Sequence, residues 1–259
     1  MLPAITAALL AFLVLASGAA ATTAATLPAA DAATYYALLH RQTGEYLGAA
    51  MAACFAWAAF AKPELRKFAG ALCLGVVAEG LLGALPLTTV SAMLHSCLAQ
   101  LLAASSVALV VAASKGYSRP SGTVQDYGWP SLRSLSIWLP ALIGLQVALG
   151  AAFRNRVLGL MPHVMGAMLI SIFILVVGSF VLQQCKDHAP LSLAGRGLMV
   201  TTFAQVFLGL AVFTVRSMPP EAGVILVAAT AHVVTGAALL AASIVLGMQI
   251  RRSVTPKGV

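Results

Sequence analysis

Charged side chains are scarce in this sequence: only 8% of the 259 residues are Asp, Glu, Lys or Arg, whereas 61% are hydrophobic. This balance lies far outside the range of soluble domains and is typical of a membrane protein. Eight stretches supply the roughly 20 apolar residues that a membrane-spanning helix needs. They are residues 2–20, 36–60, 67–86, 89–113, 134–153, 157–182, 197–216 and 221–250. We therefore predict an all-α polytopic membrane protein, because these stretches are too long and too uniformly apolar for barrel strands.

Two further features are absent: cysteines paired for a disulfide or a zinc site, and the basic residues that begin a signal peptide. None of the four cysteines (Cys54, Cys73, Cys97 and Cys185) forms a spaced pair in a predicted outer loop, which argues against a disulfide and a zinc site. Residues 1–25 have the apolar run of a signal peptide, but no Lys or Arg precedes that run. We expect this segment to be retained as the first of eight helices.

The basic residues lie mostly on one side of the predicted membrane protein. The formal net charge is +8, which by itself suggests nucleic acid as a partner. With the N-terminus in the cytoplasm, however, the inner side carries Lys62, Arg66, Lys67, Lys115, Arg119, Arg133, Lys186, Arg196, Arg251, Arg252 and Lys257. The outer side carries only Arg41, Arg154, Arg156 and Arg216. This asymmetry satisfies the positive-inside rule, so we expect an inner (plasma) membrane protein with both termini cytoplasmic and no nucleic-acid partner.

A short motif, Glu/Gln-x-x-Leu-Gly, recurs in the outer half of three predicted helices. Its copies are Glu79–Gly83, Gln146–Gly150 and Gln205–Gly209, and each precedes a short loop and a histidine in the next helix. The spacing predicts two copies of a four-helix unit, residues 1–115 and 134–259, joined by an inner loop at 116–133. The alternative is chance similarity among Gly- and Leu-rich helices, in which small residues serve only packing.

Four histidines follow the same organisation, two in each half. Each lies near the start of a long apolar segment and has a small residue one helical turn later: His40 with Gly44, His95 with Ala99, His163 with Ala167 and His232 with Gly236. Histidines on facing helices at similar depth can hold a haem iron from both sides, and a small residue on the same face leaves room for the macrocycle. We pair His40 with His95 and His163 with His232. A plain hydrogen bond between helices is the alternative for any one of them.

The other polar residues near these histidines have roles that suit a haem. Arginine binds carboxylates in bidentate fashion, so Arg41, Arg154, Arg156 and Arg216 are candidates for the haem propionates. The alternative is that these side chains only extend to the membrane interface. Glu79 is a carboxylate well inside a predicted helix and is our candidate catalytic residue, either hydrogen-bonded or relaying a proton. We expect Gln146 and Gln205 to form hydrogen bonds across helices.

As a set, these residues resemble the heme A synthase family. His40–Gly44, which reads His-Arg-Gln-Thr-Gly, is similar to that family's His-Arg-x-x-Gly on helix two, and His95–Ala99 resembles its helix-four motif. In the second half, Gln146–Gly150 precedes His163 and Gln205–Gly209 precedes His232, as in the family. The resemblance implies eight helices in two four-helix halves. It also implies oxidation of the C8 methyl of heme O to a formyl group, which gives heme A.

The resemblance further implies a role for each histidine pair. His40 and His95 would hold the substrate haem, and His163 and His232 a permanent haem b; a heme O synthase would be a possible partner. One departure matters, because the family usually has a Glu three residues before the helix-two histidine and this chain has Ala37. The loss favours a second reading, a non-catalytic dihaem b-type electron-transfer or accessory subunit of a respiratory complex. A third reading is a haem-binding protein with an assembly or transfer role.

Overall fold

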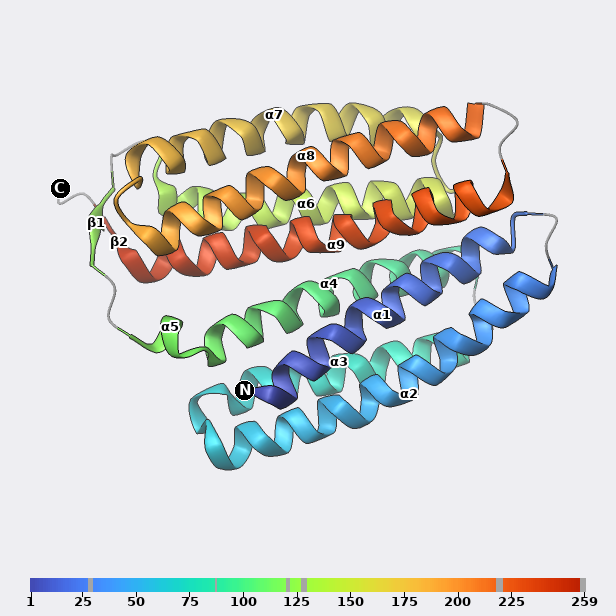
Figure 1. The fold of residues 1–259 in the computed structure, drawn as a ribbon, viewed down its shortest axis with the longest axis horizontal. Helices are drawn as coiled ribbons and strands as arrows, with labels where there is room; N and C mark the ends of the chain where they lie inside the picture. Colours follow the sequence, from blue (N-terminus) through green and yellow to red (C-terminus); the bar gives the residue numbers. More distant parts are fainter. Residues whose placement is uncertain (28–29, 87, 120–121, 127–129, 218–220, 257–259) are drawn as a thin grey trace.

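Long helices make up almost the whole chain in the computed structural model, which describes residues 1–27, 30–86, 88–119, 122–126, 130–217 and 221–256 (Figure 1). The first half contains α1 (Leu2–Ala24), α2 (Ala30–Ala61), the 3-10 turn η1 (Pro63–Leu65), α3 (Arg66–Ala84) and α4 (Thr89–Ala113). The connecting segment contains α5 (Lys115–Ser118) and β1 (Val124–Gln125). The second half contains α6 (Leu132–Arg154), α7 (Leu160–Gln184), α8 (Ala189–Ser217), α9 (Ala222–Ser253) and β2 (Val254–Thr255).

Within these described ranges, eight helices are long and apolar enough to cross a membrane. Each overlaps one of the eight predicted segments, so the prediction of an all-α polytopic membrane protein is confirmed. Many large apolar side chains remain exposed on the outside of the bundle, such as Phe60, Leu74, Leu169 and Phe207. A lipid bilayer is the environment in which such a surface is stable.

Local sequence signals set several helix ends. The hydroxyl of Thr88 accepts the backbone N–H of Ser91 at the start of α4, and Ser131 does the same for Ser134 at the start of α6. These caps satisfy N–H groups that have no partner within the helix. After α6 the chain turns at Arg156, which has the left-handed φ of 59°. That turn carries the chain into α7.

The helices form two four-helix bundles that lie side by side (Figure 1). In the first, α1 contacts α2 and α4, and α3 lies between α2 and α4; in the second, α6, α7, α8 and α9 repeat this cyclic order. Each bundle has its own apolar core. Met51 and Leu109 are fully buried in the first core, and Leu198 and Leu246 in the second. The first bundle is formed by helices within residues 2–113 and the second by helices within residues 132–253, while the division into two repeated halves stays a prediction.

Small side chains form the contact between the two bundles. Helix α9 packs against both α1 and α4, and α4 also touches α6. Ala237 of α9 is buried in the first core, and Ala104 of α4 in the second. Close packing of small residues is how helices associate where lipid removes the hydrophobic driving force. The halves therefore share a packed interface along α4 and α9.

The described part of the connecting segment contains a short helix and a strand where the sequence predicts a loop at 116–133. Strand β1 pairs in parallel with β2 after α9, with Val124 opposite Val254. The carboxylate of Asp126 accepts the backbone N–H groups of Leu132 and Arg133 at the start of α6. Residues 120–121 and 127–129 of the predicted loop, and Lys257 of the basic tail, lie outside the described residues. The segment thus ties the C-terminal end of the chain to the second bundle.

Candidate functional site

All four predicted histidines lie toward the same end of the two bundles. They come from α2, α4, α7 and α9, which run in one direction, and each lies within the first third of its helix or close to it (Figure 1). The fifth histidine, His188, lies at the opposite end, where its Nδ1 accepts the backbone N–H of Leu191 in the first turn of α8. The four helical histidines therefore form a set that His188 does not join.

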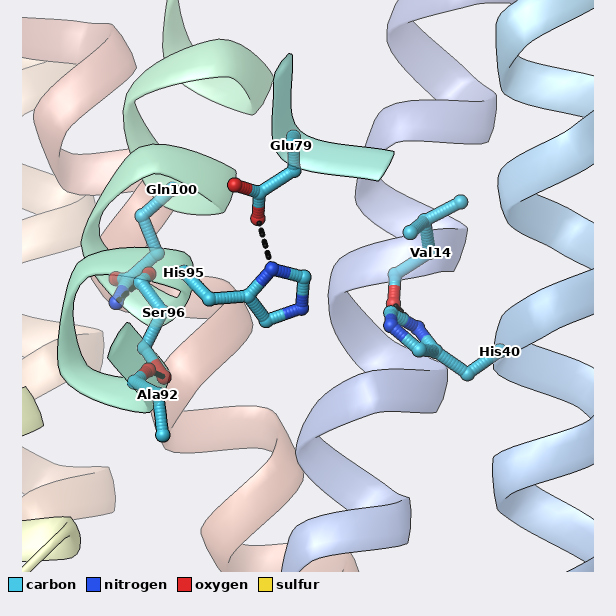
Figure 2. Close-up of polar contacts among 7 residues, drawn as sticks. All are labelled: Val14, His40, Glu79, Ala92, His95, Ser96 and Gln100. Carbon is cyan, nitrogen blue, oxygen red and sulfur yellow. Dashed lines mark hydrogen bonds and ion pairs between the residues drawn. The ribbon is translucent and has the colours of Figure 1, made fainter. Parts of the chain in front are cut away.

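The structure brings the predicted partners together. The ring centroids of His40 and His95 are 6.1 Å apart, and their planes are inclined by 89°. In the second bundle the centroids of His163 and His232 are 6.3 Å apart, with an angle of 87°. Figure 2 shows the ring of His95 directed toward that of His40, with α1 behind them. Two equivalent histidine pairs thus lie one in each bundle.

The separation of the rings would suit a metal ion held between two imidazoles. Metal–imidazole bonds are about 2.0 Å long and the ring centre lies about 1.1 Å behind the bonded nitrogen, so two such ligands place their centroids about 6 Å apart. Within the described part of the chain, no group of three or more His, Cys, Asp or Glu side chains is placed to hold an ion. Two protein ligands alone suit a metal whose other positions are filled by a macrocycle, which is the arrangement in haem.

A glycine on the preceding helix faces each histidine ring. A Cβ atom added to the glycine would lie 2.8 Å from Cε1 of the ring at Gly18, which requires the ring to shift, and 3.0–3.1 Å from Cε1 at the other three, which is tighter than most Cβ contacts. The four pairs are Gly18 with His40, Gly83 with His95, Gly150 with His163 and Gly209 with His232. Three of these glycines end the predicted motif copies. The glycine of the motif therefore makes room for the imidazole.

The residue four positions before each glycine lies one turn away on the same helix face and contacts the same ring. In α3, Oε1 of Glu79 is 3.0 Å from Nδ1 of His95 (Figure 2). In the second bundle, Nε2 of Gln146 is 2.9 Å from Nδ1 of His163, and Nε2 of Gln205 is 3.3 Å from Nε2 of His232. The expected hydrogen bonds of both glutamines across helices are thus confirmed. Of these groups, the carboxylate of Glu79 is the kind of acceptor that fixes the orientation of a metal-ligating histidine.

Helix α1 provides the fourth copy of this arrangement, which the sequence did not reveal. Nδ1 of His40 donates to the backbone oxygen of Val14 at 3.0 Å, and Ser17 lies beside the same nitrogen at 3.4 Å. The Ser17 hydroxyl is in turn 3.2 Å from that of Thr43. Because the acceptor is a backbone carbonyl, the side chain at position 14 carries no signal. Only Gly18, four residues later, marks the relation to the other three copies.

Several buried polar atoms around the rings have no hydrogen-bond partner among the described residues. They are Oε2 of Glu79, Oε1 of Gln146, Oε1 of Gln205 and Nδ1 of His232. His232 differs from the other three histidines because it turns Nε2, not Nδ1, toward its glutamine. Unpartnered polar atoms are rare in protein interiors and often mark functional sites. These unpartnered atoms lie at the two histidine pairs, which supports the histidine pairs as functional sites.

The small residues one turn after the histidines do not all leave open space. No atom lies within 4 Å of a Cβ added to Gly44, in agreement with the expected room beside His40. At Gly236 the added Cβ would lie 3.4 Å from the side chains of both Gln100 and Gln205. Gly236 therefore allows close packing between α9 and its neighbours, α4 and α8.

The four outer arginines are not placed alike. Arg154 donates to the backbone oxygen of Ala19 at 2.6 Å and to the hydroxyls of Thr22 and Thr23 near the end of α1. This joins α6 of the second bundle to α1 of the first. The other three side chains, those of Arg41, Arg156 and Arg216, are exposed at the histidine end. They are free to reach an anionic group there, whereas Arg154 already has polar partners.

The carboxylates near the first pair also differ in position. Glu79 is 14% exposed and contacts His95, whereas Ala37, three residues before His40, is exposed and offers no polar group. Sequence reasoning passed over Glu45, which lies in the middle of α2 and is exposed. Glu79 is therefore the carboxylate built into the first-half site.

No family model matches this chain, and no curated protein matches it either. Inferences about function therefore depend on the two histidine pairs and the residues around them.

Proposed function

We propose that this multi-pass membrane protein holds two haems, one in each bundle, each bound between two histidines. The observation that supports this most directly is the separation of 6.1 and 6.3 Å between the ring centroids of the two pairs. In such a site the iron provides the redox chemistry and the protein controls orientation, hydrogen bonding and access of water.

The residues around each ring have defined tasks in this proposal. The backbone oxygen of Val14 and the carboxylate of Glu79 would accept the Nδ1–H of His40 and His95, which would leave Nε2 of each ring for a metal, while the amide of Gln146 contacts Nδ1 of His163 and holds that ring in place. The glycines opposite the rings let each imidazole lie against the preceding helix. The exposed Arg41, Arg156 and Arg216 lie at the end where propionates would be bound as ion pairs.

Within this class we propose a heme A synthase-like activity, oxidation of the C8 methyl of heme O to a formyl group. The first half would bind heme O through His40 and His95, and the second half would keep a haem b on His163 and His232. The support is the combined resemblance of the four histidine motifs together with a carboxylate, Glu79, at the first pair, where the second pair has the amides of Gln146 and Gln205.

Haem extraction from the purified protein, expressed together with a supply of heme O, tests this proposal. We expect chromatography and pyridine haemochrome spectra to show heme A or its hydroxylated precursor in addition to haem b. Haem b alone, at two per chain, would reject the synthase activity and retain the two haem sites. A purified chain without haem would overturn both.

The second candidate is a dihaem b-type electron carrier or accessory subunit of a respiratory complex. The observation that favours it is the exposed Ala37, at the position where the resembling family has a Glu. A carrier would need the two pairs and their spacing but no carboxylate at that position. It would also have redox partners bound to the outside of the bundles.

We further propose that the protein lies in the inner (plasma) membrane with both termini in the cytoplasm, as the distribution of Lys and Arg indicates. Reporter fusions in the connecting segment between α5 and α6 are expected to give a cytoplasmic signal. Fusions in the turn after α6 near Asn155, between α6 and α7, should report the opposite side. The reverse pattern would exclude this topology.

A further inference from the structure

The two haem sites differ in one chemical respect that their geometry makes visible. Three of the four rings contact a neutral partner: the backbone carbonyl of Val14 or the amides of Gln146 and Gln205. The fourth, His95, faces the carboxyl group of Glu79 at 3.0 Å. Glu79 occupies the same place in the first half that Gln205 occupies in the second. The two halves therefore share one arrangement of helices and histidines, but the side chain that contacts His95 is a carboxyl group and the one that contacts His232 is an amide.

A carboxylate that accepts the Nδ1–H of a ligating imidazole makes the opposite nitrogen a stronger electron donor than a neutral acceptor does. Stronger donation favours the more highly charged, oxidised iron. Hydrogen bonding to an axial ligand is one of the means by which a protein sets the potential of a haem. Since Glu79 is largely buried, water screens its effect only weakly.

Charge near the second histidine pair would raise the midpoint potential of the second-half haem and so widen the difference between the two haems. Arg154 is the last residue of α6 and follows Gly150, the glycine that faces His163, by one helical turn. A nearby cation favours the less positively charged, reduced iron. The first half thus has a largely buried anion, Glu79, beside one of its ligands, and the second half has a partly buried cation, Arg154, near one of its own; Arg41, next to His40 in the sequence, is exposed, so water screens its charge.

We propose that Glu79 is a positioning residue that acts through His95 to hold the first-half haem at a lower midpoint potential than the second-half haem. This inference rests on the proposed function. The difference gives electron transfer a direction: the first-half site is oxidised and the second-half site is reduced, so electrons leave the half where a substrate haem would be bound. Glu79 does not itself have to touch a reacting atom.

Redox titration of full-length variants tests this. His163→Ala should remove the second-half haem, so that the first-half haem is the only one titrated. In this background, Glu79→Gln should shift the midpoint potential of the first-half haem to a more positive value. Glu45→Gln is the matched control, because it removes an exposed carboxylate of the neighbouring helix α2 and should leave the potential unchanged. An unshifted potential in Glu79→Gln, or an equal shift in both variants, would overturn the inference.

The reciprocal variant covers the case in which Glu79→Gln loses its haem. In a His40→Ala background, Gln205→Glu places a carboxyl group beside His232 and should shift the second-half potential to a more negative value. A potential that stays in place there would also overturn the inference. In either case, two haems in the unmodified chain would leave the proposed function standing, whereas a chain that binds none would remove both.

Discussion

Replacing His163 with alanine is expected to halve the haem content, from two haems per chain to one. The variant loses one of the two nitrogens that would bind the iron. His232, whose ring lies 6.3 Å from that of His163 in the unmodified protein, would be the one ligand left in the second pair. The first pair lies in the other bundle, around a separate core, so its haem should remain. Pyridine haemochrome analysis per mole of protein measures the loss directly.

His188→Ala is the matched control for this substitution. It removes an imidazole of the second half that caps α8 at the opposite end of the bundle, so both haems should remain. His40→Ala should have the converse effect and remove the first-half haem only. Full haem content in both His163→Ala and His40→Ala would refute the assignment of these residues as ligands.

Helix positions were predictable from the sequence, because an apolar stretch of about 20 residues has few alternatives to a spanning helix. The residues at which the helices begin and end were less predictable. Helix α8 begins at Ala189 and α2 at Ala30, whereas the apolar stretches begin at 197 and 36. Both helices continue into segments with polar residues, where backbone hydrogen bonding extends the helix although the hydropathy pattern has ended.

The histidine pairs were also predictable, because a costly polar residue at a repeated position in apolar helices is visible in the sequence alone. The contacts behind the rings were predictable only where a side chain provides them, as for Gln146 and Gln205. Val14 contributes a backbone oxygen, which any residue has, and so α1 remained unrecognised as the fourth copy. Arg154 donates to the end of α1, a neighbour that only the tertiary arrangement reveals, and its role as a candidate for a propionate stays a prediction.

Gly150→Val is expected to disrupt the second-half site as strongly as loss of a ligand. A Cβ at this position would lie 3.0 Å from Cε1 and 3.3 Å from Nδ1 of His163, and the two methyl groups of valine need additional space. The ring must then move from the position in which Gln146 holds it. Overpacking of this kind costs about 1–3 kcal/mol. We expect haem content close to one per chain and a lower melting temperature in detergent.

Gly144→Val separates this steric effect from the effect of valine on helix α6 itself. Both glycines lie in α6, so both substitutions bring the same β-branched side chain into one helix, but no atom lies within 4 Å of a Cβ added to Gly144. Gly144→Val should therefore keep two haems per chain. If Gly150→Val kept them as well, with an unchanged spectrum, the close approach of α6 to His163 would have no part in holding the ring. If both variants lost haem equally, the cause would lie in the helix and not in the contact with the imidazole.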